Sequence, residues 1–281
     1  MDAQQVQTAL AGLKLGEVRF FTSLDSTNNE AARWIEAGAP NLALVVSDEQ
    51  TRGRGRDGRT WYTPAGTAVA FSLVIYPTET VAHVQSRLTA LGALAVREAL
   101  YKHYSLPAQI KWPNDVLLHR RKLAGVLAEA HWSGDQLKAL ILGVGINVAP
   151  QAVTEAQRQD GSLHFPAGSI EEYTGSPVDR VSLLQQVLTE LLYWRPRLGT
   201  QEFLQAWEAN LAFRGEPVQV AIGQSTGKDG LPRSLEGSSP TVEAGSILGL
   251  SPDGSLRLRK ADGEVVNIHF GEVRLRPVRT P

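Results

Sequence analysis

The strongest candidates for a binding or catalytic role lie in a segment rich in glycine and arginine. Residues 50–61 read QTRGRGRDGRTW, in which four arginines are interleaved with glycines. Glycine lets the backbone approach a ligand closely, and the planar guanidinium of arginine suits carboxylate and phosphate groups. The segment ends at Trp61, an aromatic plane on which a base could stack. An anionic ligand is therefore expected here, although a solvated loop or a weak RNA-binding patch has the same composition.

A second set of polar side chains lies in residues 111–115 (KWPND), at the end of a predicted strand. Pro113 disfavours helical geometry in the residue before it and fixes a turn. We therefore expect Lys111, Asn114 and Asp115 at a strand edge. A cation, an amide and a carboxylate would then converge there, but an ordinary turn between strands would read the same way.

Two apolar strands contribute further candidates. Lys122 begins an apolar run, where it either extends along the surface to solvent or aims its charge into a cleft, and the sequence alone favours the first interpretation. Gly143 and Gly145 interrupt another apolar run that ends at Asn147. Glycine inside a strand indicates close approach by a ligand or by another backbone, or a bulge.

The elements that must position these residues follow from apolar periodicity. Thr27 and Glu30 have the spacing of a capping box, so a helix is expected to begin at Ser26 or Thr27. Further helices are expected over residues 80–104 and, as two patterns, within 180–212. Strands are expected over residues 18–21, 42–46, 67–76, 109–112, 116–118, 123–130 and 137–148. This mixture predicts an α+β fold in which residues 51–66 form a long connection between two strands.

The pattern changes after Phe213 to short alternating runs divided by Gly, Pro, Asp and Ser. Such runs are typical of a small β-barrel or sandwich. We therefore expect a first domain over residues 1–212 and a second over 213–281. Within the second, the polar stretch from Gly223 to Gly245 is expected to be a mobile loop.

Composition excludes several classes of function. The 281 residues carry 28 Lys and Arg against 29 Asp and Glu, a net charge of −1, which argues against an Arg/Gly nucleic-acid binder. With no cysteine there is no disulfide, thiolate nucleophile or Cys-ligated metal. There is no apolar run long enough to span a bilayer, and residues 1–16 lack the apolar core of a signal peptide. A cytoplasmic protein without a membrane partner is expected.

Together, five segments in this order resemble the biotin protein ligases, which attach biotin to carboxylases. They are residues 25–28 (DSTN), the glycine and arginine segment ending at Trp61, KWPND, residues 122–125 (KLAG) and residues 145–147 (GIN). The resemblance implies a catalytic domain over residues 1–212, a mixed β-sheet with flanking helices in the class II synthetase-like biotin–lipoate ligase fold. It implies an SH3-like β-barrel over residues 213–281, where residues 271–276 (GEVRLR) are similar to the family's C-terminal module.

The family's reaction joins biotin and Mg-ATP to biotinyl-5′-AMP and pyrophosphate, after which a lysine of a biotin carboxyl carrier protein or domain takes the biotinyl group. Biotin, ATP and Mg²⁺ are therefore the expected ligands. A lipoate or octanoate ligase or transferase shares the fold and is an alternative, as is a non-catalytic biotin sensor. The first matching motif begins at Ser26, which leaves no room for a winged helix-turn-helix, so we expect no DNA partner. The resemblance leaves homodimer formation open.

The same resemblance implies roles for individual residues. Those implied to be catalytic are Arg56, Lys111, Asp115 and Lys122. Those implied to contact biotin are Ser26, Thr27, Asn28, Gln50, Gly53, Arg54, Gly55, Arg56, Lys122, Gly125 and Gly145. Those implied to contact ATP are Arg54, Arg56, Arg59, Trp61, Lys111, Asn114, Lys122 and Asn147. The ureido head of biotin has one carbonyl and two N–H groups, and it needs hydroxyl and amide partners when desolvated. Asp115 would either bind Mg²⁺ or orient the incoming lysine.

Overall fold

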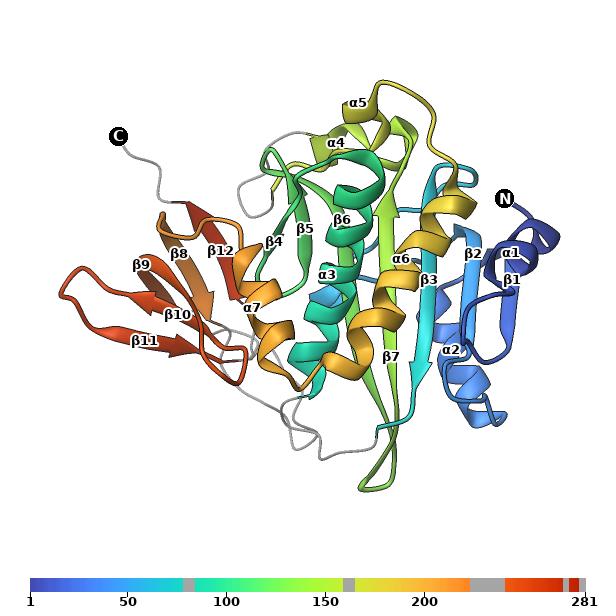
Figure 1. Ribbon diagram of the computed structural model, residues 1–281, viewed down its shortest axis with the longest axis horizontal. Helices are drawn as coiled ribbons and strands as arrows, with labels where there is room; N and C mark the ends of the chain where they lie inside the picture. The colour runs from blue at the N-terminus through green and yellow to red at the C-terminus, as the bar shows by residue number, and fades with distance from the viewer. Residues whose placement is uncertain (78–83, 159–164, 223–240, 270–272, 278–281) are drawn as a thin grey trace.

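The computed structural model describes residues 1–77, 84–158, 165–222, 241–269 and 273–277. Their centre is a seven-stranded mixed sheet in the order β1-β2-β3-β7-β6-β5-β4, in which only β1 and β2 pair in parallel (Figure 1). Its strands are β1 (Val18–Leu24), β2 (Leu44–Gln50), β3 (Ala68–Ile75), β4 (Gln109–Lys111), β5 (Asp115–Leu118), β6 (Arg121–Ser133) and β7 (Gln136–Asn147). The expected α+β class and mixed sheet are confirmed.

Helices lie on both faces of this sheet. The long helix α3 (Val84–Tyr104) and helix α6 (Arg180–Trp194) cover one face (Figure 1). Helix α2 (Thr27–Glu36) packs on β2, β3 and β7 from the other face, and α1 (Ala3–Leu10) contacts α6 and β1. Shorter helical turns are η1 (Arg56–Gly58), η3 (Pro150–Ala152), α4 (Glu155–Arg158), α5 (Glu171–Thr174) and η4 (Arg195–Arg197). Among the helices that the structure describes, none is long and apolar enough to cross a bilayer.

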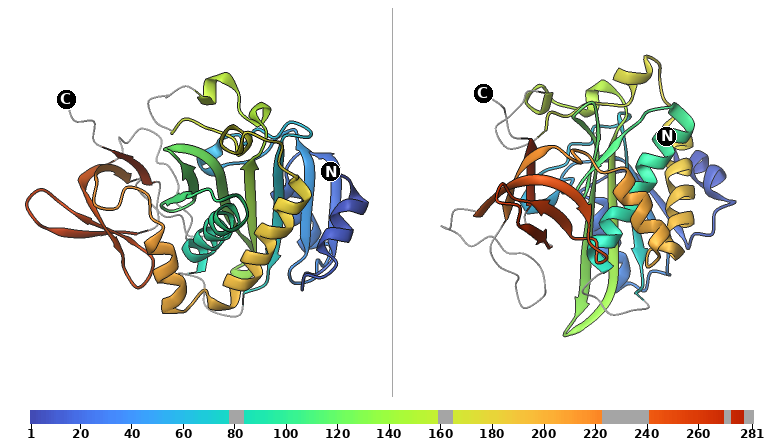
Figure 2. Two further views of the ribbon diagram at one scale, coloured as in Figure 1. Left: turned by 45° about the horizontal axis from the view of Figure 1, so that its top comes forward. Right: turned by 60° about the vertical axis from the view of Figure 1, so that its left-hand side comes forward.

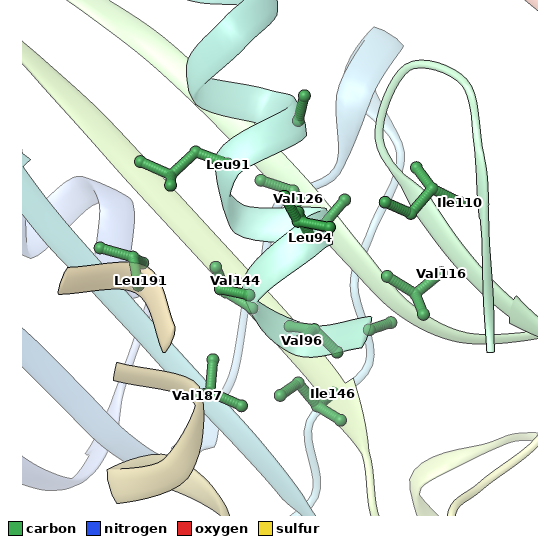
Figure 3. Packing of buried hydrophobic residues seen from close by; sticks show 14 of the residues in the cluster. Leu91, Leu94, Val96, Ile110, Val116, Val126, Val144, Ile146, Val187 and Leu191 are labelled. Atoms are coloured by element: carbon green, nitrogen blue, oxygen red, sulfur yellow. The ribbon is translucent and has the colours of Figure 1, made fainter. Parts of the chain in front are cut away.

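The main core forms where α3 and α6 meet the sheet. Figure 3 shows Val126, Val144 and Ile146 of the strands facing Leu91 and Leu94 of α3. Because neighbouring residues of a strand point to opposite faces, the alternate positions of β6 and β7 face the other side of the sheet. Those alternate positions are the ones available to build a site.

Helix α2 begins at Thr27 as expected, but two other local expectations, the capping box and the start of the strand at residue 42, are wrong. The cap of α2 is Ser26, whose side chain makes no cap hydrogen bond, and Thr27 is already the first helical residue. The N–H of Thr27 donates instead to Oε1 of Gln50 at 2.8 Å, and Glu30 accepts from Arg33 at 2.9 Å, so no capping box forms. The strand expected from residue 42 begins at Leu44, because Leu42 has a positive φ of 60°.

The chain after helix α7 (Gln201–Ala209) forms a five-stranded antiparallel sheet in the order β11-β10-β9-β8-β12. Its strands are β8 (Pro217–Ile222), β9 (Thr241–Leu250), β10 (Leu256–Arg259), β11 (Val265–Ile268) and β12 (Val273–Pro277). This small sheet is consistent with the expected SH3-like module. Most of the expected mobile loop, residues 223–240, lies outside the described residues, whereas residues 241–245 belong to β9.

The second sheet lies beside the β4 and β5 edge of the first, as Figure 1 and the left-hand view of Figure 2 show. The buried indole of Trp112 donates to the carbonyl of Gly254 at 2.9 Å. Glu208 of α7 accepts from the backbone N–H of Leu250 at 2.8 Å. The turn between β9 and β10, which contains Gly254, therefore packs directly against the KWPND motif.

This junction predicts a difference between two glycines of the second sheet. Gly254 and Gly263 have φ of +87° and +90°, but a Cβ at Gly254 would lie 2.8 Å from Trp207, whereas nothing lies within 4 Å of one at Gly263. We expect Gly263→Ala to lower the free energy of unfolding by about 1–2 kcal/mol through backbone strain alone. Gly254→Ala should cost about 1–3 kcal/mol more, because it also overpacks the junction.

Urea unfolding of both variants and the parent chain measures this difference. Equal losses in the two variants would show that Trp207 yields without cost and that the junction is loosely packed.

Candidate active site

Almost every residue singled out from the sequence lines one cavity of about 320 Å³. It lies on the sheet face opposite α3, between the start of α2, the glycine and arginine segment and the β4–β5 hairpin. From the expected set it is lined by Ser26, Thr27, Asn28, Gln50, Arg54, Gly55, Arg56, Arg59, Trp61, Lys111, Asn114, Asp115, Lys122, Gly125, Gly145 and Asn147. It is also lined by Thr60, Tyr62, Val126, Leu127, Gly143, Val144, Gln157, Phe165 and Ala167. Gly53 is the expected residue that does not line it.

The glycine and arginine segment is a pinned hairpin rather than an open loop. Gly53 accepts a hydrogen bond from the Trp61 N–H at 2.8 Å, and a Cβ on Gly53 would lie 2.3 Å from the Trp61 carbonyl oxygen. The Gly55 N–H donates to the Arg59 carbonyl at 2.7 Å across the short helix η1. Gly53 therefore holds the hairpin closed and acts on the cavity through Trp61.

Asp115 forms the electrostatic centre of the cavity. Its Oδ1 lies 2.6 Å from Nζ of Lys122, and its Oδ2 lies 3.3 Å from Nζ of Lys111. Burial by itself would raise the pKa of Asp115, but the charges and hydrogen bonds of the two lysines outweigh it and hold that pKa well below its usual range. The carboxylate is therefore ionised, and it gathers two ammonium groups at one end of the cavity.

The surface interpretation of Lys122 is wrong. Its ammonium turns into the cavity, where it pairs with Asp115 and lies 5.4 Å from the ring centre of Trp61. Lys111 likewise lies 5.1 Å from the ring centre of Phe165. Each lysine therefore lies between a carboxylate and an aromatic face, an arrangement that favours a cation electrostatically.

The glycines of β6 and β7 admit close side chains rather than another backbone. A Cβ on Gly145 would lie 2.4 Å from Nε1 of Trp61, and one on Gly125 would lie 3.1 Å from the same ring. A Cβ on Gly143 would lie 2.2 Å from Oδ1 of Asn28. The indole of Trp61 and the amide of Asn28 thus lie directly against the strands. The Trp61 ring rests on glycines expected to contact biotin, and its buried N–H finds no hydrogen-bond partner among the described residues.

At the other end of the cavity, hydroxyl and amide groups form a chain of hydrogen bonds that ends on the carboxylate of Glu129, whose charge is balanced by the guanidinium of Arg54. Thr27 Oγ1 donates to Gln50 Oε1 at 3.2 Å. The Ser72 hydroxyl lies 2.8 Å from Thr27 Oγ1 and 2.6 Å from Asn28 Oδ1. Asn28 Nδ2 donates to Glu129 Oε2 at 2.7 Å. The cavity therefore has a neutral polar end and a cationic end.

Sequence reasoning missed Ser72 and Glu129. The sequence could have indicated Glu129, because it is the one charged residue between Leu123 and Ala130. It could not have indicated Ser72, since a serine in an apolar strand is common. Asn147 was expected to contact ATP, and its amide is engaged with the carbonyl of Gly168 at 3.0 Å, which holds the segment after residue 164 against β7.

The residues around Asp115 do not fit a magnesium site built by the protein. Both carboxylate oxygens already lie within ion-pair distance of a lysine. Across the described ranges, no group of three or more His, Cys, Asp or Glu residues could hold a metal ion. Because Mg²⁺ prefers several oxygen ligands and is repelled by ammonium groups, the lysines are the cations that this end of the cavity provides.

Comparison with known proteins agrees with this geometry. Residues 20–147 match the model of the biotin/lipoate A/B protein ligase family. A biotin–[acetyl-CoA-carboxylase] ligase of Paracoccus denitrificans is 36% identical over 71% of this chain and 82% of its own length. The bifunctional ligase/repressor BirA of Bacillus subtilis is 29% identical over 90% of this chain and 72% of its own. The biotin protein ligase of Aquifex aeolicus, solved with biotin and ATP, has a TM-score of 0.75 at 28% identity and covers 93% of this chain and 99% of its own.

The Asp115 ion pairs predict a pH-dependent stability. A carboxyl group whose pKa is lower in the folded chain stabilises the fold above its unfolded pKa of about 3.9, and this contribution is lost as the pH falls toward the folded value. Asp115→Asn should lower the free energy of unfolding by about 3–5 kcal/mol at pH 7, because it removes the buried negative charge that faces the ammonium groups of Lys111 and Lys122. The difference from the parent chain should shrink below about pH 4.

Chemical denaturation at several pH values measures this, with Asp135→Asn at an exposed turn as the control. A deficit in Asp115→Asn that stayed constant down to pH 2 would contradict the assignment of the ion pairs.

Proposed function

The chain belongs to the biotin protein ligase family, and we propose that it makes biotinyl-5′-AMP from biotin and ATP and then transfers the biotinyl group to one lysine of a biotin carboxyl carrier protein or domain. The observation that supports this most is the division of one cavity into a neutral polar end and a cationic end. Biotin has the same division, because its ureido head is neutral and polar and its tail ends in a carboxylate.

The neutral end favours biotin over lipoate. Thr27 and Gln50 line the cavity with hydroxyl and amide groups, and the buried hydroxyl of Ser72 supports them from behind in one hydrogen-bonded chain. A ureido head can exchange its hydrogen bonds with water for bonds to such groups, whereas the dithiolane ring of lipoate would leave them unpaired. The cost of leaving buried polar groups unpaired is the usual source of strong discrimination between ligands.

The cationic end suits the first chemical step. A carboxylate oxygen of biotin attacks the α-phosphorus of ATP, the bond to the bridging oxygen breaks, and pyrophosphate leaves. Both reacting groups are anions, so they approach only where fixed positive charge offsets their repulsion. Lys111 and Lys122 supply that charge, and Asp115 holds them in place before the substrates arrive. Arg56, which donates to Asn114 at 3.3 Å, ties the glycine and arginine segment to the same end.

In the second step the amine of the carrier lysine attacks the acyl carbon of the adenylate, the bond from that carbon to the phosphate oxygen breaks, AMP leaves, and the proton of the amine passes to solvent. A free lysine has a pKa near 10.4, so it arrives protonated. Because the pKa of Asp115 lies well below its usual range, Asp115 is a weak base for that proton. We assign to Asp115 the electrostatic orientation of the ammonium rather than its deprotonation. We propose a cytoplasmic location for the reaction, with which the cysteine-free composition is compatible.

Exchange of labelled pyrophosphate into ATP tests the first step directly. We expect exchange that depends on biotin, because adenylate formation is reversible, and little or none with lipoate or octanoate. A lipoate or octanoate ligase would reverse this preference, and a non-catalytic biotin sensor would bind biotin without exchange. Transfer to an apo carrier domain, lost when its target lysine is replaced by arginine, tests the second step.

Lys122→Ala should slow biotin-dependent exchange about 100- to 1,000-fold, since removal of one fixed charge at a developing anion commonly costs this much. The control is Lys138→Ala, because Lys138 of β7 is exposed and lies 3.9 Å from Glu36 outside the cavity. Exchange within about threefold of the parent in Lys122→Ala would remove Lys122 from the mechanism.

A further inference from the structure

One carboxylate outside the expected site, Glu129 of β6, contacts both the hairpin and the neutral end of the cavity. Its Oε1 pairs with the guanidinium of Arg54, and its Oε2 accepts from Asn28 Nδ2 at 2.7 Å. Arg54 and Glu129 are 75 residues apart in the chain, and Asn28 and Glu129 are 101 apart. Glu129 is thus the point at which three distant segments meet.

These contacts change the role of Arg54. Its guanidinium also donates through Nη1 to Oδ1 of Asn29 at 2.8 Å, so it is bound to both α2 and β6. A guanidinium whose charge is paired and whose donors are shared in this way is a poor ligand for an anion. Arg54 therefore anchors the hairpin to the body of the site, unlike Arg56, which reaches toward Asn114 at the cationic end.

Glu129 also sets the direction of the hydrogen bonds at the neutral end. Both carboxylate oxygens of Glu129 accept hydrogen bonds, so Asn28 presents its Nδ2 to Glu129 and its Oδ1 to Ser72. Oδ1 in turn takes the Ser72 hydroxyl proton at 2.6 Å, which leaves the Thr27 hydroxyl to donate to Ser72 or to Gln50. A glutamine at position 129 could donate as well as accept, and this order would be lost.

We propose that Glu129 is a positioning residue that couples recognition of the biotin head to the order of the hairpin over residues 50–61. A head group that stabilises the ordered chain at Asn28 stabilises the Glu129 contact with Arg54, and a closed hairpin favours the head-binding arrangement to the same extent. This inference rests on the proposed function, because it takes biotin as the ligand of the neutral end.

The first test compares Glu129→Gln with Glu36→Gln, a control on the exposed ion pair with His131. In pyrophosphate exchange, Glu129→Gln should raise the KM for biotin about 10-fold or more, the usual effect of losing one charge-assisted hydrogen bond, with a smaller change in kcat. Glu36→Gln should match the parent. An unchanged KM in Glu129→Gln would overturn the inference.

The second test asks whether the two contacts act as one unit. Arg54→Gln should raise the KM for biotin by a similar factor, and the double variant should lose no more than about twofold beyond the worse single variant, because coupled residues are non-additive. Losses that multiply would show two independent contacts. If Glu129→Gln is too unstable to assay, Arg54→Gln alone tests the inference. An unchanged KM for biotin in Arg54→Gln would then overturn it.

Tryptic cleavage after Arg52, Arg56 and Arg59 reports directly on the order of the hairpin. If Glu129 only stabilised the fold, biotin would protect these bonds equally in the parent and in Glu129→Gln. Biotin alone should slow cleavage at these bonds in the parent and in Glu36→Gln, but not in Glu129→Gln at a biotin concentration that saturates the variant. Protection retained in Glu129→Gln would contradict the coupling. A parent chain without any biotin-dependent exchange would instead refute the proposed function, whatever the variants do.

Discussion

The placement of two lysine ammonium groups on one buried carboxylate is the constraint from which the rest of the site follows. Asp115 starts β5, Lys111 ends β4 and Lys122 lies at the start of β6, so the ion pairs form only when these three strands are in register. A buried carboxylate without these partners would be protonated or would destabilise the fold. The chain therefore assembles a concentrated positive charge as a by-product of pairing its own strands, and the charge is in place before any substrate binds.

Strand alternation gives this charge a cavity to act in. In β6 and β7 the residues facing α3 are large and apolar, among them Val126, Val144 and Ile146, and they pack the main core. Their neighbours on the opposite face are Gly125, Gly143 and Gly145, which add no volume. The same two strands thus close the core on one side and leave room on the other for an indole, an amide and a ligand.

The site also depends on contacts that join units far apart in the sequence. Glu129 links the hairpin to helix α2, and Trp112 links KWPND to the turn at Gly254 in the second sheet. Both links are hydrogen bonds from within a functional motif to a partner that carries no motif. The proposed binding end of the cavity and the seating of the second sheet therefore both depend on hydrogen bonds between segments far apart in the sequence.

The sequence by itself was enough to predict the α+β class and the main strands and helices, because periodicity and glycine, proline and charge patterns are local properties of the chain. Its resemblance to the biotin protein ligases supplied sixteen of the residues that line the cavity, and the structure added nine more. It could not decide whether Lys122 faces solvent or the cavity, since that depends on the register of β5 against β6. Nor could it show that Arg54 is paired, that Thr27 bonds Gln50 instead of forming a capping box, or that Ser72 belongs to the site. Each of these rests on a partner at least 23 residues away along the chain. Local patterns specify which elements form, and only their packing in three dimensions decides which side chains meet.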